Sequence, residues 1–280
     1  AEDGIRDCLL SRGLGDVYKR QMDNTASPVI CKPLEHGAAV VVHSLTKFIG
    51  GHGTVIGGCL VDGGNFDWTA DPKRQPLFNE PDMSYGGAKW GEVVPQLTGA
   101  NVSFAIRARV CLLRDLGAPL APDNAWGIIQ GLETAPLRMK QHCSNAEKAV
   151  DFLKKHKNVE RVIYPTLHEG EIAARSKKYF KGGNGALVGI EVKGGVEAGK
   201  KFIESLKMFY HVANIGDARS LAIHPATTTH SQLTEEELLA AGVTPGYVRL
   251  SIGIEHPDDI IADLDQALNQ SGKPNLKAVG

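Results

Sequence analysis

The sequence predicts an α/β fold, and two observations support this class. Residues 38–44, AAVVVHS, are almost continuously apolar and rich in β-branched side chains, which is typical of a parallel strand covered on both faces. Stretches with helical spacing of apolar residues follow, and further strand candidates come after them. We therefore expect a partial large domain with a mostly parallel sheet, followed by a smaller C-terminal α/β domain.

Composition excludes several classes of function. The chain has 280 residues, of which 42% are hydrophobic, enough for one large or two ordinary domains. The 31 basic and 32 acidic side chains give a net charge of −1, so nucleic acid and membrane partners are not expected. No apolar run approaches the roughly 18 residues of a membrane span. The five cysteines are scattered without a CxxC pair, which favours a reducing cytoplasm and argues against a metal site.

The first half is expected to contain two strands joined by loops and helical stretches. Residues 57–62, GGCLVD, are a second strand candidate, and residues 62–90 read as a long irregular loop. Apolar spacing predicts a helix over 101–117 that ends at a glycine, and a long helical stretch over 124–156 interrupted near Pro136. Residues 28–38 are expected to be helical at their centre.

The second half reads as another α/β unit. Strands are expected within residues 159–165, 186–194, 220–225 and 247–255. Helices are expected within residues 197–209, 234–242 and 257–270. Thr234 and Glu237 have the spacing of a capping box, which marks the start of the middle helix.

Ser44, Thr46 and Lys47 follow the first strand and precede a glycine-rich stretch. Hydroxyls and an amine are thereby placed at the carboxyl edge of a sheet, where open α/β sheets bind ligands. Hydroxyls and backbone N–H groups can hold a phosphate, and glycine lets the backbone approach it closely. The lysine could neutralise a phosphate or act as a nucleophilic amine.

Other interpretations of this stretch differ in how well its residues match them. A plain lysine beside a turn loop also fits the composition. A phosphate-binding GxxxxGK[ST] loop requires the glycines before the lysine, and the spacing of Gly51, Gly53 and Gly57 does not match a dinucleotide fingerprint. The SxxK motif of penicillin-binding enzymes requires SDN and KTG partners, which the sequence lacks.

Asp23, in MDNT, stands where the preceding strand should end. Neighbouring parallel strands would bring Asp23 and Lys47 to the same edge of the sheet. A carboxylate facing a pyridine nitrogen and a lysine facing an aldehyde are two requirements of a pyridoxal phosphate site. An Asx turn within DNT is an equally open reading of Asp23.

Residues 22–59, from MDNT to VIGG, resemble the cofactor-lysine region of the Cys/Met-metabolism pyridoxal-phosphate enzymes. QGLETAPLRMKQHCSNA, NIGDARSLAIHPATTTHSQLT and VRLSIGIEHPDDIIADLDQAL resemble later segments of the same family. The resemblance runs from about Met22 to near Asn269 and implies a fold-type I transferase that uses pyridoxal 5'-phosphate. Within the family, NEPDMSYGG, GDARSLAIHPATTTHSQLTEEE and AAGVTP most resemble the O-acetylhomoserine sulfhydrylases.

The resemblance assigns cofactor roles residue by residue. Lys47 matches the lysine that binds the cofactor covalently and later shuttles protons, so it is also the expected catalytic residue. Asp23 matches the partner of the pyridinium nitrogen. Ser44 and Thr46 match phosphate ligands, and Asn24 matches a residue that contacts the cofactor ring or the substrate.

The resemblance also assigns substrate contacts. Arg249 matches the arginine that grips the substrate α-carboxylate, a task suited to a bidentate fork, and Ser220 matches a residue near that carboxylate. Without the family, Arg249 could be a salt-bridged strand residue and Ser220 a turn residue. His224 and His230 are expected to be hydrogen-bonded loop histidines rather than metal ligands. Tyr85 and Trp90 could line a substrate entrance or simply pack.

Residues 1–21 depart from the family pattern. Lys19, Arg20 and Gln21 stand where a buried strand should be apolar. We therefore expect residues 1–21 to be a leader unrelated to the family, and the family sequence to be an N-terminally truncated fragment. Residues 22–140 are expected to form the C-terminal part of the cofactor-binding large domain, and residues 141–280 the small domain.

The resemblance implies a specific reaction. O-acetyl-L-homoserine and sulfide would give L-homocysteine and acetate by replacement at the γ-carbon, a step of sulfur amino-acid biosynthesis. The alternatives are a cystathionine γ-synthase or γ-lyase of the same family, or a catalytically inactive fragment. The family also implies a homo-oligomer, a tetramer in its members, and the partners expected are an amino-acid substrate and sulfide or a thiol.

Overall fold

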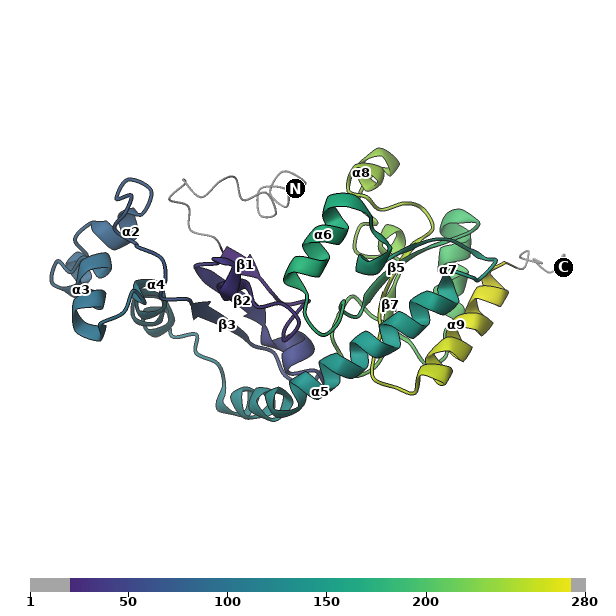
Figure 1. Ribbon diagram of the computed structural model, residues 1–280, viewed down its shortest axis with the longest axis horizontal. Coiled ribbons are helices and arrows are strands. Elements are labelled where there is room, and N and C mark those ends of the chain that lie inside the picture. Colours follow the sequence, from purple (N-terminus) through teal and green to yellow (C-terminus); the bar gives the residue numbers. More distant parts are fainter. Residues whose placement is uncertain (1–20, 273–280) are drawn as a thin grey trace. The chain divides into compact units, whose positions relative to one another are not determined.

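The computed structural model describes residues 21–272 and divides them into two compact units (Figure 1). Unit 1 comprises the described residues 21–25, 32–45 and 56–126. Unit 2 comprises residues 26–31 and 46–55 together with the chain from residue 127 onward. The expected leader lies outside the described residues except for Gln21, which opens the first strand.

Unit 1 is built on a three-stranded sheet in the order β1-β2-β3. The strands are β1 (Gln21–Asp23), β2 (Val40–Ser44) and β3 (Gly58–Asp62). β1 and β2 are parallel, whereas β2 and β3 are antiparallel. The expectation of mainly parallel pairing thus holds for the first pair and not for the second, because the chain between β2 and β3 turns back without a crossover helix.

Helices and a small aromatic core complete unit 1. The helices are η1 (Pro33–His36), α2 (Pro76–Asn79), η3 (Met83–Tyr85), α3 (Trp90–Thr98), α4 (Ser103–Arg107) and η4 (Ala108–Arg114). The core cluster of unit 1 contains Ala39, Val40, Trp68, Phe78, Trp90 and Val94. Trp68 is 1% exposed and anchors the otherwise irregular segment predicted over 62–90. The helix α3 was not predicted, and it contains an internal proline, Pro95.

Unit 2 is built on a five-stranded sheet in the order β4-β5-β8-β7-β6. The strands are β4 (Val159–Ile163), β5 (Leu187–Val192), β6 (Tyr210–His211), β7 (Leu221–Ile223) and β8 (Tyr247–Ser251). All neighbours pair antiparallel except β6 and β7, which are parallel. Each predicted strand of the second half is present, and β6 was not predicted.

The helices of the second half are α5 (Pro122–Leu153), η5 (Pro165–Leu167), α6 (Gly170–Tyr179), α7 (Gly195–Ser205), η6 (Pro225–Thr227), α8 (Glu235–Ala240) and α9 (Pro257–Ser271). Side chains of the sheet of unit 2 pack with side chains of α5, α7 and α9 in one core cluster. The capping box at Thr234 is confirmed: its hydroxyl accepts from the Glu237 N–H and the Glu237 carboxylate accepts from the Thr234 N–H.

The predicted interruption at Pro136 is wrong, because α5 continues through it as one helix. Pro136 is exposed, while residues on both sides of it are buried in unit 2, so packing outweighs the hydrogen bond that proline removes. Lys140, where a domain boundary is expected, lies within this helix, and the compact units change at residues 126–127; the domain division stays a prediction. None of the helices in the described range 21–272 is long and apolar enough to cross a membrane.

Candidate functional site

Unit 1 brings three of the predicted cofactor residues together at the carboxyl ends of β1 and β2. Asp23 ends β1 in register with Val42 of β2, and the Asn24 N–H donates to the Val42 carbonyl at 2.9 Å. The Thr25 N–H donates to Asp23 Oδ1 at 2.9 Å, and the Ser44 N–H donates to Thr25 Oγ1 at 2.8 Å. The turn after β1 is therefore tied to the end of β2, and Asp23, Asn24 and Ser44 share one edge of the sheet.

Asp23 forms the Asx turn that the sequence left open as an alternative. The turn occupies one carboxylate oxygen; among the described residues no hydrogen bond reaches Oδ2. Asp23 is exposed, whereas Asn24 is buried at 6% exposure. Burial lowers the pKa of the neighbouring His43 imidazole, and the Asp23 carboxylate opposes this shift in part. The Asx turn and a role for the second oxygen are thus compatible.

Unit 2 contains Lys47, and its amine has a specific partner. Lys47 lies in η2 (Leu45–Ile49), where its backbone departs from helical angles at φ −91 and ψ −131. Its Nζ donates to the side-chain oxygen of Asn214. Arg249, on β8, donates from Nη2 to the backbone carbonyl of Asn214 at 3.3 Å. One residue therefore connects the amine of Lys47 to the guanidinium of Arg249.

Asn214 is the functional candidate that sequence reasoning missed. It lies at the start of the NIGDARS segment, 167 residues after Lys47, so no local spacing links the two. The available signal was its place directly before Ile215, Gly216 and Asp217, in a segment that the family resemblance had already singled out. Thr46 is half-buried beside Lys47 in η2. The expectation that Asp23 and Lys47 share one sheet edge stays a prediction.

Ser220 is fully buried and its hydroxyl is already engaged. Oγ donates to Glu255 Oε2 at 2.9 Å and accepts from the Gly253 N–H at 2.8 Å. The Ser220 N–H donates to Glu255 Oε1 at 2.6 Å. These bonds tie the segment before β7 to the segment after β8. Any part that Ser220 plays in substrate binding would therefore run through the segments it holds.

The loop histidines have protein partners. His224 Nε2 lies 2.8 Å from the Pro245 carbonyl, which can only accept, so Nε2 carries the proton and Nδ1 accepts from the Thr227 hydroxyl at 2.8 Å. Burial lowers the pKa of His224, which favours this neutral form. His230 Nδ1 lies 2.8 Å from Thr229 Oγ1. Within residues 21–272, no cluster of three or more His, Cys, Asp or Glu side chains could hold a metal.

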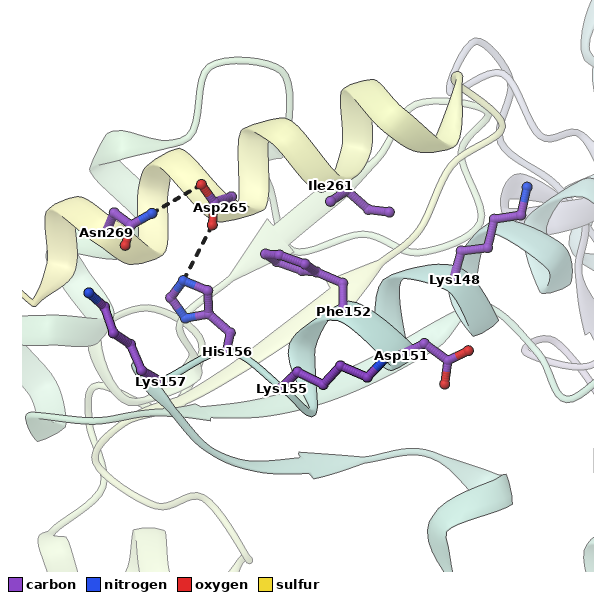
Figure 2. Close-up of a pocket in the computed structure, with 9 residues that line it drawn as sticks. All are labelled: Lys148, Asp151, Phe152, Lys155, His156, Lys157, Ile261, Asp265 and Asn269. Atoms are coloured by element: carbon purple, nitrogen blue, oxygen red, sulfur yellow. Dashed lines mark hydrogen bonds and ion pairs between the residues drawn. The ribbon is translucent and has the colours of Figure 1, made fainter.

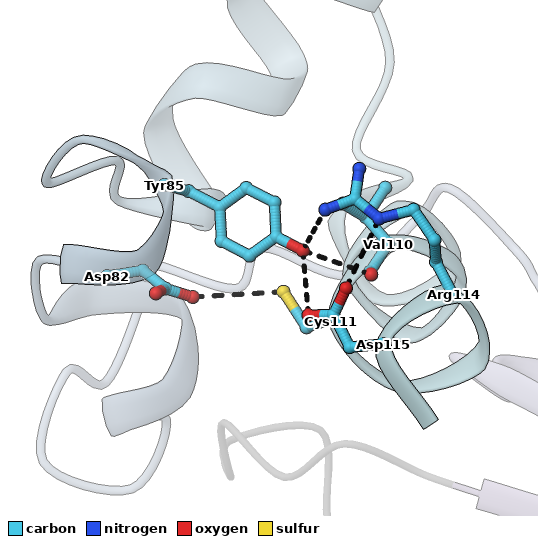
Figure 3. Close-up of polar contacts among 6 residues, drawn as sticks. All are labelled: Asp82, Tyr85, Val110, Cys111, Arg114 and Asp115. Carbon is cyan, nitrogen blue, oxygen red and sulfur yellow. Dashed lines mark hydrogen bonds and ion pairs between the residues drawn. The ribbon is translucent and has the colours of Figure 1, made fainter. Parts of the chain in front are cut away.

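Tyr85 and Trp90 pack against each other in unit 1, with ring centroids 5.0 Å apart. The Tyr85 hydroxyl accepts from Arg114 at 2.6 Å and donates to Asp115 at 2.9 Å (Figure 3). The Trp90 indole N–H donates to Asp82 at 2.9 Å. These contacts join η3 to α3 and η4, which favours the packing role over a substrate entrance.

A surface groove of about 680 Å³ lies elsewhere in unit 2, between α5 and α9 (Figure 2). Its lining comprises Lys148, Asp151, Phe152, Lys155, His156, Lys157, Ile261, Asp265 and Asn269. His156 pairs with Asp265 at 3.5 Å, and the lysine amines lie apart from one another in Figure 2. No predicted site residue lines this groove, so it is separate from the chemistry around Lys47.

The family model described as "Cys/Met metabolism PLP-dependent enzyme" matches residues 17–269. This chain belongs to that family. The match begins slightly before Met22, where the resemblance was first placed, and it confirms the fold-type I class and the pyridoxal phosphate dependence of the family.

The curated relatives include an O-acetyl-L-homoserine sulfhydrylase and a homocysteine synthase. The chain is 55% identical over 252 residues to an O-acetyl-L-homoserine sulfhydrylase of Leptospira meyeri, covering 88% of this chain and 57% of the relative. It is 45% identical over 249 residues to a homocysteine synthase of Schizosaccharomyces pombe, again covering 88% of this chain and 57% of the relative. The chain thus spans about 57% of the length of these curated relatives.

A solved structure supports the same placement. The chain matches a putative O-acetylhomoserine (thiol)-lyase of Campylobacter jejuni with a TM-score of 0.81 and 42% identity, covering 90% of this chain and 59% of that one. That protein carries N'-pyridoxyl-lysine-5'-monophosphate, a pyridoxyl group joined to a lysine.

Each of the two units contains side chains whose chemistry suits pyridoxal phosphate. Within the part of the chain that the structure describes, the Lys47 amine meets an amide oxygen and no carboxylate, so it is not neutralised by an ion pair. Asp23 has an oxygen without a hydrogen bond among the described residues, suited to a protonated ring nitrogen. Ser44 and Thr46, on either side of Leu45, supply hydroxyls suited to a phosphate.

Proposed function

We propose that the protein catalyses γ-replacement on O-acetyl-L-homoserine with sulfide, producing L-homocysteine and acetate. The Cγ–O bond to the acetate group breaks and a Cγ–S bond forms. The names of the relatives support this substrate, and family membership supports the cofactor. Because the chain spans about 57% of those relatives, the activity is assigned to the whole protein of this family type.

The observation that carries the proposal is the convergence of Lys47 and Arg249 on Asn214. An α-amino acid presents an amine and a carboxylate on one carbon. Arg249 offers a charged guanidinium for the carboxylate, while Lys47 offers an amine next to the α-carbon. An amine and a guanidinium that both bind Asn214 suit a substrate that has an amine and a carboxylate on one carbon, and this supports the proposal.

Each site residue has its own task in the proposed reaction. Pyridoxal phosphate, when bound, withdraws electrons from the substrate α-carbon and so stabilises negative charge there. Lys47 Nζ holds the cofactor and moves protons at the α- and β-carbons. Asp23 keeps the ring nitrogen protonated, Ser44 and Thr46 hold the phosphate, and Asn24 contacts the ring. Arg249 orients the substrate carboxylate, with Ser220 fixing nearby backbone.

We also propose a cytoplasmic location and a homo-oligomer. Cys59, Cys111 and Cys143 are free thiols in the described residues, which suits a reducing compartment. The tetramer found in the family supports assembly of identical subunits.

The first test is a visible absorption spectrum of the purified chain with pyridoxal phosphate, before and after borohydride. We expect a band that borohydride abolishes and that Lys47→Ala lacks. Lys200→Ala is the matched control, because Lys200 is an exposed lysine of unit 2 paired with Glu197 on α7. Absence of the band in the unmodified chain would favour the inactive-fragment alternative.

The second test separates the members of the family. Chain that binds the cofactor is incubated with O-acetyl-L-homoserine and with sulfide, cysteine or no thiol. Homocysteine formed with sulfide alone supports the proposal. Cystathionine formed with cysteine would indicate a γ-synthase, and ammonia released without a thiol would indicate a γ-lyase.

A further inference from the structure

Arg138 is a buried arginine of α5 whose hydrogen bonds go to backbone carbonyls. It is 6% exposed, and in residues 21–272 no carboxylate forms an ion pair with it. Nη1 donates to the Phe48 carbonyl at 2.7 Å, and Nη2 donates to the Ile49 carbonyl at 2.8 Å and to the Gly131 carbonyl at 2.6 Å. Burial of an arginine without an acidic partner is costly, so the carbonyls must supply its stabilisation.

Two of these carbonyls belong to the residues directly after Lys47. Because the backbone at Lys47 is not helical, the following carbonyls lack regular helical partners. The Lys47 carbonyl accepts from the Gly51 N–H at 2.7 Å, and the Gly51 carbonyl accepts from the Ala218 N–H at 2.7 Å. Arg138 supplies the donors for the Phe48 and Ile49 carbonyls between these two bonds, and His52 Nδ1 lies 2.6 Å from the Gly50 carbonyl.

Glycines let the guanidinium and the loop approach each other. Gly51 has φ +71, and a Cβ there would overlap the Arg138 guanidinium. A Cβ at Gly131 would overlap the Gly50 carbonyl, and a Cβ at Gly216 would lie 2.5 Å from the Phe48 nitrogen. The loop after Lys47 therefore has close contacts with α5 and with the segment that contains Asn214. Little free space remains for it to shift.

We propose that Arg138 is a positioning residue for Lys47. By holding the carbonyls of Phe48 and Ile49 with one rigid fork, it fixes the backbone from which the Lys47 side chain extends toward Asn214. The inference rests on the proposed function, in which the Lys47 amine must reach the cofactor and the substrate. Arg138 itself need not touch either of them.

Arg138→Lys distinguishes positioning from mere filling of the interior. Lysine keeps the positive charge and most of the apolar stem, but its single ammonium cannot reproduce a planar fork aimed at two carbonyls. Loss of the fork should loosen Lys47 and break its bond to Asn214. Reactivity of the Lys47 amine therefore reports the position directly, without any need for catalysis.

The experiment is reductive methylation of the cofactor-free chain, with lysine modification rates mapped by peptide mass spectrometry. We expect Lys47 to be modified about tenfold faster in Arg138→Lys, the factor for loss of one protecting hydrogen bond. Exposed lysines such as Lys200 should keep their rates. The matched control is Tyr164→Phe, which removes a buried hydrogen bond to Gly185 elsewhere in unit 2. A folded Arg138→Lys with an unchanged Lys47 rate, or an equal effect of Tyr164→Phe, overturns the proposal.

If circular dichroism shows that Arg138→Lys does not fold, Thr134→Ala decides the question. The exposed Thr134 hydroxyl accepts from Arg138 Nε at 3.1 Å, so its removal disturbs the fork from outside the core. We expect Lys47 to react roughly threefold faster, a fraction of one hydrogen bond; no change overturns the proposal.

Failure of the proposed function would look different. It would appear as no borohydride-sensitive band in the unmodified chain, while the methylation comparison, made without cofactor, would still stand. In cofactor-loaded protein, Arg138→Lys should lower kcat and change KM little, since Arg249 is untouched.

Discussion

His142 is a buried imidazole of α5 in an environment that resists protonation. It is 0% exposed, and its Nδ1 lies 2.7 Å from the Ile252 carbonyl, so Nδ1 must donate. Nε2 is buried with no hydrogen-bond partner in the described residues. The Phe48 ring and the imidazole form a T-shaped contact, with their ring centroids 5.2 Å apart. Burial, with help from the Arg138 charge, lowers the pKa of His142 to about 4.

The lowered pKa makes folding stability depend on pH. The unfolded histidine titrates near pH 6.5, so between about pH 6.5 and pH 4 the unfolded chain binds the proton and the folded chain does not. Stability is therefore lost as the pH falls through this window. The complete shift corresponds to about 3 kcal/mol, and acidification from about pH 7.5 to about pH 5.5 should cost about 1.4 kcal/mol through His142 alone.

Urea unfolding of the chain and of His142→Asn, followed at both pH values, measures this cost. Asparagine keeps an amide N–H near the position of Nδ1 for the Ile252 carbonyl and does not titrate. His43, His156 and His224 also have lowered pKa values, and they contribute equally to both proteins. The difference between the two pH dependences isolates His142. If both proteins showed the same pH dependence, His142 would not be the source of the lost stability.

Three further substitutions test other contacts. Asp263→Asn should lower the free energy of unfolding, measured by urea titration, by about 2 kcal/mol. The buried carboxylate accepts from the backbone N–H groups of residues 207–209, and an amide nitrogen cannot accept. An unchanged urea midpoint would contradict this prediction. Asn214→Asp should weaken the binding of pyridoxal phosphate roughly tenfold, because the new carboxylate would pair with the Lys47 amine. The neutral Asn214→Ser should bind the cofactor as the unmodified chain does. Equal cofactor binding by the two variants would contradict the electrostatic argument. Ser220→Ala should cost about 2 kcal/mol in thermal unfolding by leaving a buried backbone N–H without its acceptor, and a fully retained Tm would show that another group replaces the hydroxyl.

Local sequence patterns determined much of the fold. The apolar run at residues 38–44 formed β2, and the alternation of strands and helices in the second half was predicted because each element has its own periodicity. The capping box at Thr234 was also predictable, because its two partners lie within one helical turn. Asp23 could be placed at the end of a strand for the same reason, since the motif and the strand are adjacent in sequence.

Other local patterns were overridden or were too weak. Pro136 predicted a break in α5, but buried residues before and after it hold the helix together. α3 contains an internal proline, and α6 is largely polar with no buried residue, so neither gave a clear signal. β6 is two residues long and exists only because it pairs with β7.

Short motifs and local periodicity were enough to predict the α/β class and the family, and the resemblance predicted Lys47 as the catalytic residue. The surroundings of Lys47 could not be predicted in this way. Asn214 lies 167 residues away from it, and Arg138 is separated by 90 residues from Phe48, whose carbonyl it binds. A buried hydrogen bond depends on where two segments meet in space. Segments this far apart in the sequence leave no local pattern from which their contact could be predicted.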